Sequence, residues 1–343
     1  MRKVDFTDIK KILVIEAPMP EIMIEDEVKI KVQYCSFCGD DIAIIEDTQR
    51  RNKRQLRYIG QLFSGTIVDL GVEATKMGFV KGDSVSGHIW NFCGKCPYCR
   101  RGKENLCMDS SSSGGAFQEY VVYKANQLCV LPSNVSIQNG CFVSEIAACI
   151  HGIRRAGIDY GKKVLILGAG AIGLNMMQLA KMHGGVQVTV IEPIESRRRL
   201  ASALGADFVL AGCSDREVLE IMRITEYLGY DVILDASRNI HAVEESLGFL
   251  AKGGCILINS LFKVEDCLNI DLSTLYAKEC SILTTYMSAY TLNDAVSFIN
   301  RLHIQELIGP EYELENVQKA FDDFIKKRYP RVMVRISPDK KCE

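Results

Sequence analysis

A glycine-rich turn in the middle of the chain constrains the fold most strongly. Residues 168–173 are Gly-Ala-Gly-Ala-Ile-Gly; they follow the apolar run KKVLIL and open the helical pattern IGLNMMQLAKMHG. Between a strand and a helix, such glycines permit a tight turn, let backbone N–H groups approach a pyrophosphate, and let the helix pack closely on the strand. The N-terminus of the helix favours the negative charge of the pyrophosphate. The residues predicted to bind a dinucleotide are Gly168, Gly170, Ala171, Ile172 and Gly173.

The next strand indicates which dinucleotide is bound. Glu192 ends the apolar run VTVIE, where a carboxylate can accept hydrogen bonds from both ribose hydroxyls and would repel a 2′-phosphate. NAD is therefore preferred over NADP. Arg197 begins the run Arg-Arg-Arg shortly afterwards, and arginines there can bind a 2′-phosphate, so NADP stays open as the alternative. We expect both side chains to lie at the cofactor.

Length and charge narrow the class of protein. The 343 residues favour two domains, and a formal net charge of -2, from 41 basic and 43 acidic side chains, provides no general attraction for nucleic acid or an anionic membrane. The first ten residues lack the apolar core of a signal peptide, and the uncharged run 164–180 is interrupted by glycines. These features favour a cytoplasmic protein without nucleic-acid or membrane partners.

The pattern along the chain predicts two kinds of domain. Residues 1–145 consist of short β-rich runs bounded by turn residues, whereas from about residue 160 to 285 apolar strands alternate with helical stretches such as NIHAVEESLGFLAKGG. That alternation is typical of a buried parallel sheet with crossover helices. The tail predicts two helices, at Leu292–Leu302 and Leu314–Lys326, and a closing strand VMVRI. We therefore predict a β domain made of 1–145 and 290–343, and an inserted α/β domain at 146–289.

Four of the fourteen cysteines have the spacing of a metal site. Cys93, Cys96, Cys99 and Cys107 lie in the short segment CGKCPYCRRGKENLC. Four thiolates at this spacing suit tetrahedral zinc and leave no open position for chemistry, so this zinc would be structural. Disulfides are the alternative, which the cytoplasmic assignment disfavours.

Taken together, these motifs resemble the zinc-containing alcohol dehydrogenases of the medium-chain dehydrogenase/reductase superfamily, particularly the polyol, sugar and threonine dehydrogenase branch. The resemblance also covers Cys38-Gly-Asp-Asp41, Phe63-Ser-Gly65, Gly114–Tyr120 and His151–Gly157. It implies an α/β protein with a GroES-like β domain and an inserted Rossmann domain with a doubly wound parallel sheet, assembled as a homodimer or homotetramer. It also implies hydride transfer between nicotinamide and an alcohol, with a second zinc that binds the alcohol oxygen.

The residues expected to hold that second zinc depart from the family pattern. Cys38 matches the first ligand, but the family's proton-relay Ser or Thr is Asp40, and its histidine ligand is replaced by Gln61. The third ligand position is Ser144, and the proline that follows it in the family is Glu145. We therefore expect Cys38, Asp40, Gln61 and Glu145 to line the reaction centre.

Three hypotheses remain for this centre. Cys38, Asp40 and Glu145, with or without Gln61, could hold zinc in a rearranged site, with Cys38 as its thiolate ligand. Alternatively no zinc binds there, and Asp40 or Glu145 acts as general base or acid after burial raises its pKa. In the third hypothesis, the site is inactive and the protein only binds a nucleotide.

The predicted function is an NAD-dependent oxidoreductase acting on a secondary alcohol or ketone of a polyol, sugar or cyclitol. A zinc-independent reductase of a carbonyl or activated alkene is the alternative enzyme, and an NAD(H)-binding sensor or scaffold is the alternative without catalysis. The basic run Arg50-Arg-Asn-Lys53-Arg54, with Arg57, lies in a stretch that borders the substrate cleft in the family that the chain resembles. A solvated loop is the favoured interpretation of this run, and binding of a phosphorylated or acidic substrate is the alternative.

Overall fold

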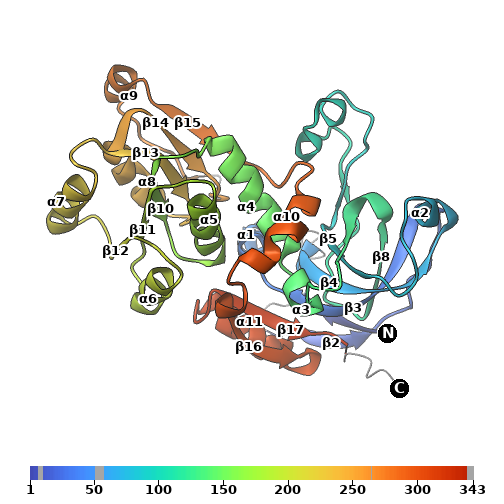
Figure 1. The fold of residues 1–343 in the computed structure, drawn as a ribbon. Helices are drawn as coiled ribbons and strands as arrows, with labels where there is room; N and C mark the ends of the chain where they lie inside the picture. Colours follow the sequence, from blue (N-terminus) through green and yellow to red (C-terminus); the bar gives the residue numbers. More distant parts are fainter. Residues whose placement is uncertain (7–10, 51–57, 264, 338–343) are drawn as a thin grey trace. The chain divides into compact units, whose positions relative to one another are not determined.

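The chain divides into two compact units in the computed structural model, which describes residues 1–6, 11–50, 58–263 and 265–337 (Figure 1). The first unit comprises Met1–Ala147 and Ala289–Glu343, and the second comprises Ala148–Ser288. The two ends of the chain thus belong to one unit, and the middle of the chain forms the other. In the parts of the chain that the structure describes, no helix has the length and apolar character needed to cross a membrane.

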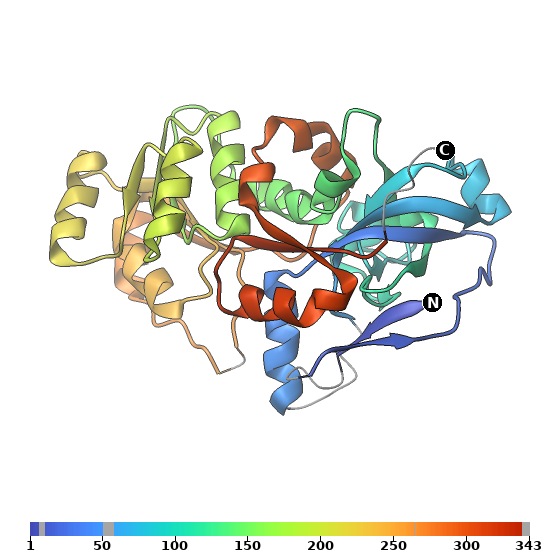
Figure 2. The same cartoon turned by 90° about the horizontal axis from the view of Figure 1, so that it is seen from below.

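The first unit is built on a seven-stranded sheet that the C-terminal segment completes. Strands from the two ends of the chain are neighbours: β17 pairs antiparallel with β3, and the two run side by side in Figure 2. Along β3, buried and half-buried residues alternate, as expected for a strand with one face on the core. The strands are, in spatial order, β16 (Ile308–Glu313), β17 (Arg331–Arg335), β3 (Glu27–Ser36), β4 (Leu62–Leu70), β5 (Ser84–Gly87) and β9 (Leu128–Val130), with β8 (Tyr120–Lys124) pairing with β3.

Aromatic packing joins distant segments in the core of this unit. The ring of Phe37, just after β3, lies 4.5 Å from that of Phe117 and is stacked 5.4 Å from that of Phe324. Phe6 and Phe321 meet the same ring edge-on, at 6.2 and 5.6 Å. Aromatic pairs at these separations stabilise a core beyond their buried area. The residue that precedes Cys38 is therefore held on several sides.

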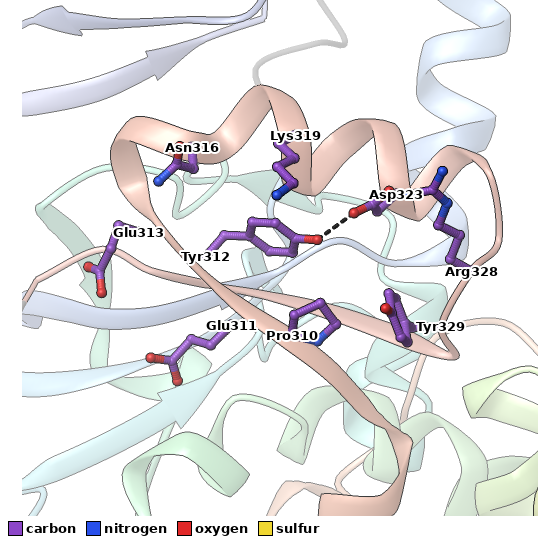
Figure 3. Close-up of a pocket in the computed structure, with 9 residues that line it drawn as sticks. All are labelled: Pro310, Glu311, Tyr312, Glu313, Asn316, Lys319, Asp323, Arg328 and Tyr329. Atoms are coloured by element: carbon purple, nitrogen blue, oxygen red, sulfur yellow. Dashed lines mark hydrogen bonds and ion pairs between the residues drawn. The ribbon is translucent and has the colours of Figure 1, made fainter.

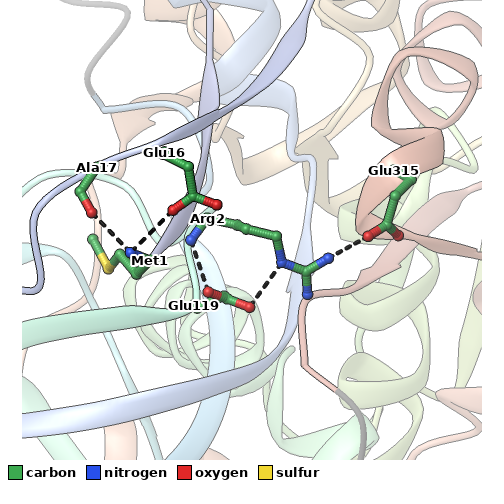
Figure 4. Close-up of polar contacts among 6 residues, drawn as sticks. All are labelled: Met1, Arg2, Glu16, Ala17, Glu119 and Glu315. Atoms are coloured by element: carbon green, nitrogen blue, oxygen red, sulfur yellow. Dashed lines mark hydrogen bonds and ion pairs between the residues drawn. The ribbon is translucent and has the colours of Figure 1, made fainter.

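Polar contacts fix the N-terminus to the same unit (Figure 4). The terminal amine donates to Ala17 O at 2.8 Å and lies 3.4 Å from a carboxylate oxygen of Glu16. Arg2 donates through its backbone N–H and its Nε to Glu119, at 2.7 and 2.9 Å, and its guanidinium also pairs with Glu315. Residues from the start, middle and end of the chain thus meet at one place.

Shorter elements complete the first unit. Two-stranded sheets pair β1 (Arg2–Asp5) with β2 (Leu13–Glu16) and β6 (Trp90–Asn91) with β7 (Ser111–Ser112). Its helices are α1 (Gly39–Arg50), α2 (Val72–Lys76), α3 (Ile137–Gly140), α10 (Leu292–Phe298) and α11 (Val317–Ile325). Helix α4 (Val143–Ala156) begins in this unit and ends in the other.

The second unit is a parallel six-stranded sheet with helices between its strands. Its strand order is β12-β11-β10-β13-β14-β15, which is the order 3-2-1-4-5-6 of a Rossmann fold. The strands are β10 (Lys163–Leu167), β11 (Gln187–Ile191), β12 (Phe208–Leu210), β13 (Tyr230–Asp235), β14 (Leu250–Ile258) and β15 (Ser281–Thr284). The helices are α5 (Ala171–Met182), α6 (Glu195–Ala203), α7 (Asp215–Ile224), α8 (Ile240–Ser246) and α9 (Leu272–Lys278). The predicted Rossmann sheet is confirmed.

The structure corrects some predicted elements. The helix expected through Gly254 ends as α8 at Ser246, and residues from Leu250 onwards form β14. Helix α1 occupies a segment where only strands and turns were expected. The two helices predicted in the tail are present as α10 and α11, each joined to a 3₁₀ turn, and the closing strand VMVRI is part of β17.

Candidate active site

The four predicted zinc ligands of the first unit converge. The sulfur atoms of Cys93, Cys96, Cys99 and Cys107 all lie within 4.8 Å of one another. Backbone N–H groups point at these sulfurs: those of Cys93 and Asp109 donate to Cys107 Sγ at 3.3 and 3.4 Å. The backbone N–H of Cys99 lowers the pKa of the Cys96 thiol to about 6, which favours the thiolate form that binds metal. This donor set fits tetrahedral zinc, so these residues could hold a structural ion.

The glycine-rich turn of the second unit leads from β10 into α5. Gly168 has a φ of +92°, and a Cβ on Gly173 would lie 1.9 Å from Gly168 O, so neither position accommodates a side chain. At Gly170, which precedes the first residue of α5, a Cβ would meet nothing within 4 Å. The space above this helix N-terminus is therefore open, and the backbone N–H groups of Ala171 and Ile172 begin the helix there. Such a turn is suited to bind a pyrophosphate.

Glu192 follows β11 and is fixed beside this turn. Its carboxylate accepts hydrogen bonds from the backbone N–H groups of Ala169, at 2.8 Å, and Ile194, at 2.9 Å, and only 4% of the residue is exposed. The carboxylate is thus held at the edge of the turn, and its remaining lone pairs can accept further hydrogen bonds.

The three arginines that favoured NADP have different surroundings. Arg198 donates to the backbone carbonyls of Glu192 and Pro193, at 2.8 and 2.6 Å, and Arg199 pairs with Glu195. Arg197 lies within electrostatic reach of Glu192, and partial burial lowers its pKa. Two of the three guanidinium groups are thus already engaged, which weakens the case for binding a 2′-phosphate.

Cys38 lies where β3 passes into α1, and a carboxylate fixes this turn. The Cys38 backbone N–H donates to Asp41 Oδ2 at 2.7 Å, and the Gly60 N–H donates to Asp41 Oδ1 at 3.1 Å. Asp41 is fully buried, and burial raises the pKa of its carboxyl group to about 7. Burial also raises the pKa of the Cys38 thiol, and the neighbouring carboxylates of Asp41 and Asp40 add to the effect. Asp41 therefore joins the two segments that carry Cys38 and Gln61.

Glu145 has a partner that sequence analysis missed. Its carboxylate, in the first turn of α4, forms an ion pair with the guanidinium of Arg331 at the start of β17. Both side chains are buried, with 2% and 6% of their surface exposed. Burial lowers the pKa of Arg331, while Cys38, Asp41, Asp40 and Cys141 all lie close enough to oppose that shift. A charged residue at the head of the apolar strand VMV is the sequence signal that could have identified it.

Asp40 and Gln61 are the other two residues predicted for the reaction centre. Asp40 is exposed in the first turn of α1, within electrostatic reach of Cys38 and Arg331. Gln61 directly follows Gly60, and its amide oxygen accepts a hydrogen bond from Trp90 Nε1 at 3.4 Å. The structure thus groups Cys38, Asp40, Asp41, Glu145 and Arg331.

Two further features complete the description of the first unit. Arg51, Lys53, Arg54 and Arg57 of the predicted basic segment lie outside the described residues, as does the side chain of Arg50. A surface pocket is formed by β16, α11 and the segment before β17 (Figure 3), and none of the predicted catalytic residues lines it. Inside it the Tyr312 hydroxyl donates to Asp323, which also pairs with Arg328 at 2.6 Å.

Comparison with known proteins identifies the family. Residues 24–133 match the alcohol dehydrogenase GroES-like domain, and residues 171–301 match the zinc-binding dehydrogenase domain. The chain is 32% identical to L-threonine 3-dehydrogenase of Pyrococcus furiosus over 86% of this chain and 87% of that protein. It belongs to the zinc-type alcohol dehydrogenase family.

Other relatives agree with this assignment. D-arabitol-phosphate dehydrogenase of Enterococcus avium is 28% identical over 95% of this chain and 94% of that protein. A crystal structure from Clostridium scindens, described as a zinc-binding dehydrogenase, is 28% identical, has a TM-score of 0.90, and covers 98% of this chain and 99% of its own. The predicted GroES-like and Rossmann domains are confirmed, and the chain is an enzyme of the NAD-dependent alcohol dehydrogenase class.

The catalytic zinc of this family does not fit the residues present around Cys38. Among the residues that the structure describes, the four-cysteine cluster is the one group of three or more His, Cys, Asp or Glu side chains whose donor atoms converge. Around Cys38, Glu145 is paired with Arg331, and an amide stands where the imidazole is expected. The hypothesis of a rearranged zinc site is therefore not supported by this geometry.

Proposed function

We propose that this enzyme transfers hydride between C4 of NAD and the carbinol carbon of a secondary alcohol in a polyol, sugar or cyclitol. The observation that carries the proposal is the glycine-rich turn of the second unit, with the Glu192 carboxylate hydrogen-bonded at its edge. Gly168, Gly170, Ala171, Ile172 and Gly173 would hold the pyrophosphate, and Glu192 with Arg197 would flank the adenosine ribose. NAD is favoured over NADP because the acid repels a 2′-phosphate.

Oxidation of an alcohol also releases the hydroxyl proton, which needs an acceptor. Glu145 is committed to its ion pair with Arg331, so we assign proton transfer to Asp40, which is exposed in the first turn of α1 and lies within electrostatic reach of Cys38. Bound NAD would supply the hydride acceptor, and the Asp40 carboxylate would take the hydroxyl proton. For reduction of the ketone, the protonated Asp40 would return that proton to the oxygen.

The second candidate is a zinc-independent reductase of a carbonyl or activated alkene. The Arg331–Glu145 ion pair favours it, because a centre without metal is best suited to substrates that are already polarised. We further propose that the protein is cytoplasmic, binds neither nucleic acid nor membrane, and forms a homodimer or homotetramer.

A panel of substrates tests these proposals. Nicotinamide absorbance is followed with neutral polyols, their phosphates, cyclitols, simple ketones and activated alkenes. Turnover of a polyol or its phosphate supports the first function, and turnover confined to ketones or alkenes supports the second. Arg51→Ala with Arg54→Ala should raise KM for phosphorylated substrates alone, because a cationic cluster binds phosphate. An equal KM for every substrate before and after this change would remove the role of the basic segment.

A further inference from the structure

The buried cation of the Cys38 centre lies at a place that the sheet register specifies. Strand β17 pairs antiparallel with β3, with Met333 opposite Ser36 and Val334 opposite Cys35. When this register is continued, Arg331 lies opposite Cys38. The Ser36 hydroxyl, which donates to Val332 O at 2.8 Å, shows that the two segments still run side by side there. The guanidinium is thus built into the sheet beside the thiol.

Separating Glu145 from Arg331 would cost a large amount of free energy. Glu145 and Arg331 are 4% and 5% exposed, and Arg331 Nε is buried without a hydrogen-bond acceptor. Removing one member of a buried ion pair leaves an uncompensated charge in a medium of low dielectric. The ion pair therefore holds Glu145 at Arg331 and competes with any metal ion for its carboxylate.

The same cation opposes a metal ion directly. Like charges repel strongly when both are removed from water, and a divalent ion bound at Cys38 would lie close to the fixed guanidinium. The centre already holds a fixed positive charge, because the Arg331 guanidinium is paired with Glu145 and lies within electrostatic reach of Asp40 and Asp41.

We infer that Arg331, positioned by Glu145, is the fixed cation of the Cys38 centre in place of a second metal ion, so that each chain holds one zinc. Arg331 acts here as a positioning residue that sets the charge of the centre. The inference deepens the proposed function, but it is tested by metal binding and does not require turnover.

The first measurement is the zinc content of the full-length protein and of Cys38→Ser. We expect about one zinc per chain in both, because the thiol of Cys38 ligates no metal. Two zinc ions in the wild type, with one lost in Cys38→Ser, would overturn the inference. NADH binding by the same sample reports separately on the proposed function, so the failure of one is distinguishable from the failure of the other.

The second measurement distinguishes two reasons why no second metal ion would bind: the absence of the family's metal ligands, and the positive charge of Arg331. Gln61→His with Ser144→Glu restores the donors that the family uses, and this variant is compared with the same variant carrying Arg331→Met. Titration with Co²⁺ alone should give a second tetrahedral absorption band only after Arg331 is removed. The band of the four-cysteine cluster reports that the first unit is folded in each sample. Equal binding of a second Co²⁺ with and without Arg331 would show that the cation does not exclude metal.

Discussion

The first unit contains two cysteine sites with opposite designs. In the four-cysteine lobe, defined by Cys93, Cys96, Cys99 and Cys107, four sulfurs face one another. In the Cys38 centre, the thiol lies near a guanidinium that is itself paired with a carboxylate. A bound metal would hold the lobe together, whereas in the centre an ion pair supplies the fixed charge. Each site can be broken separately, which provides the sharpest tests.

The largest effect is expected in the lobe. Cys96→Ser removes one of four ligands, and structural zinc contributes about 10 kcal/mol or more to the folding of small metal-bound segments. We expect the variant to lose its zinc and the lobe to become sensitive to protease. Cys267→Ser, at an exposed cysteine outside the cluster, is the matched control and should keep its zinc. Full zinc content in Cys96→Ser would mean that the lobe is not the metal site.

The next effect is expected in the Cys38 centre. Glu145→Gln leaves the buried guanidinium of Arg331 without its counter-charge, and breaking a buried pair costs about 3–5 kcal/mol. Urea denaturation should therefore show a lower free energy of unfolding, with unchanged zinc content. Asp40→Asn, at an exposed carboxylate nearby, should alter stability by less than about 0.5 kcal/mol while it lowers turnover. A loss of zinc in Glu145→Gln would contradict the view that the Cys38 centre holds no metal ion.

A site is easier to predict from the sequence when its residues lie close together along the chain. The lobe and the glycine-rich turn are specified by residues within one short segment, so spacing alone predicts both. The Arg331–Glu145 pair joins segments far apart in the chain, and no spacing rule connects them. Helix α1 was missed because residues 1–145 as a whole were assigned to short strands and turns, although Asp40 and Asp41 are typical of a first helical turn. The end of α8 was missed because Leu250 continues its apolar pattern into β14.

A smaller effect is expected from His88, a buried neutral side chain whose protonation makes the stability of the protein depend on pH. Burial lowers the pKa of His88, next to the lobe, from 6.5 to about 4. Between pH 6.5 and 4, the unfolded chain therefore binds a proton at His88 that the folded chain does not bind. The stability that is present above pH 6.5 is lost as the pH falls towards 4, by about 3 kcal/mol. His88→Gln should remove this part of the pH dependence, while His241→Gln, on the exposed surface of α8, should leave it unchanged. Parallel curves for wild type and His88→Gln would show that His88 is not buried in its neutral form.

The smallest effect lies in the second unit, which contains neither cysteine site. Glu192→Ser removes the charged carboxylate that would accept hydrogen bonds from the ribose hydroxyls, worth about 1.5 kcal/mol, so NADH affinity should fall about tenfold. Affinity for NADPH should rise in relative terms, because the repulsion of the 2′-phosphate is lost. Isothermal titration with both cofactors measures this change. An unchanged ratio of the two affinities would mean that Glu192 does not select the cofactor.

We expect the second unit to bind a nicotinamide dinucleotide on its glycine-rich turn. Calorimetric titration of the full-length protein with NADH measures this binding. Saturable binding of one NADH per chain is expected, abolished by Gly170→Asp, which places a side chain and a negative charge at the open N-terminus of α5. No heat of binding with NADH or NADPH at millimolar concentration would contradict this expectation.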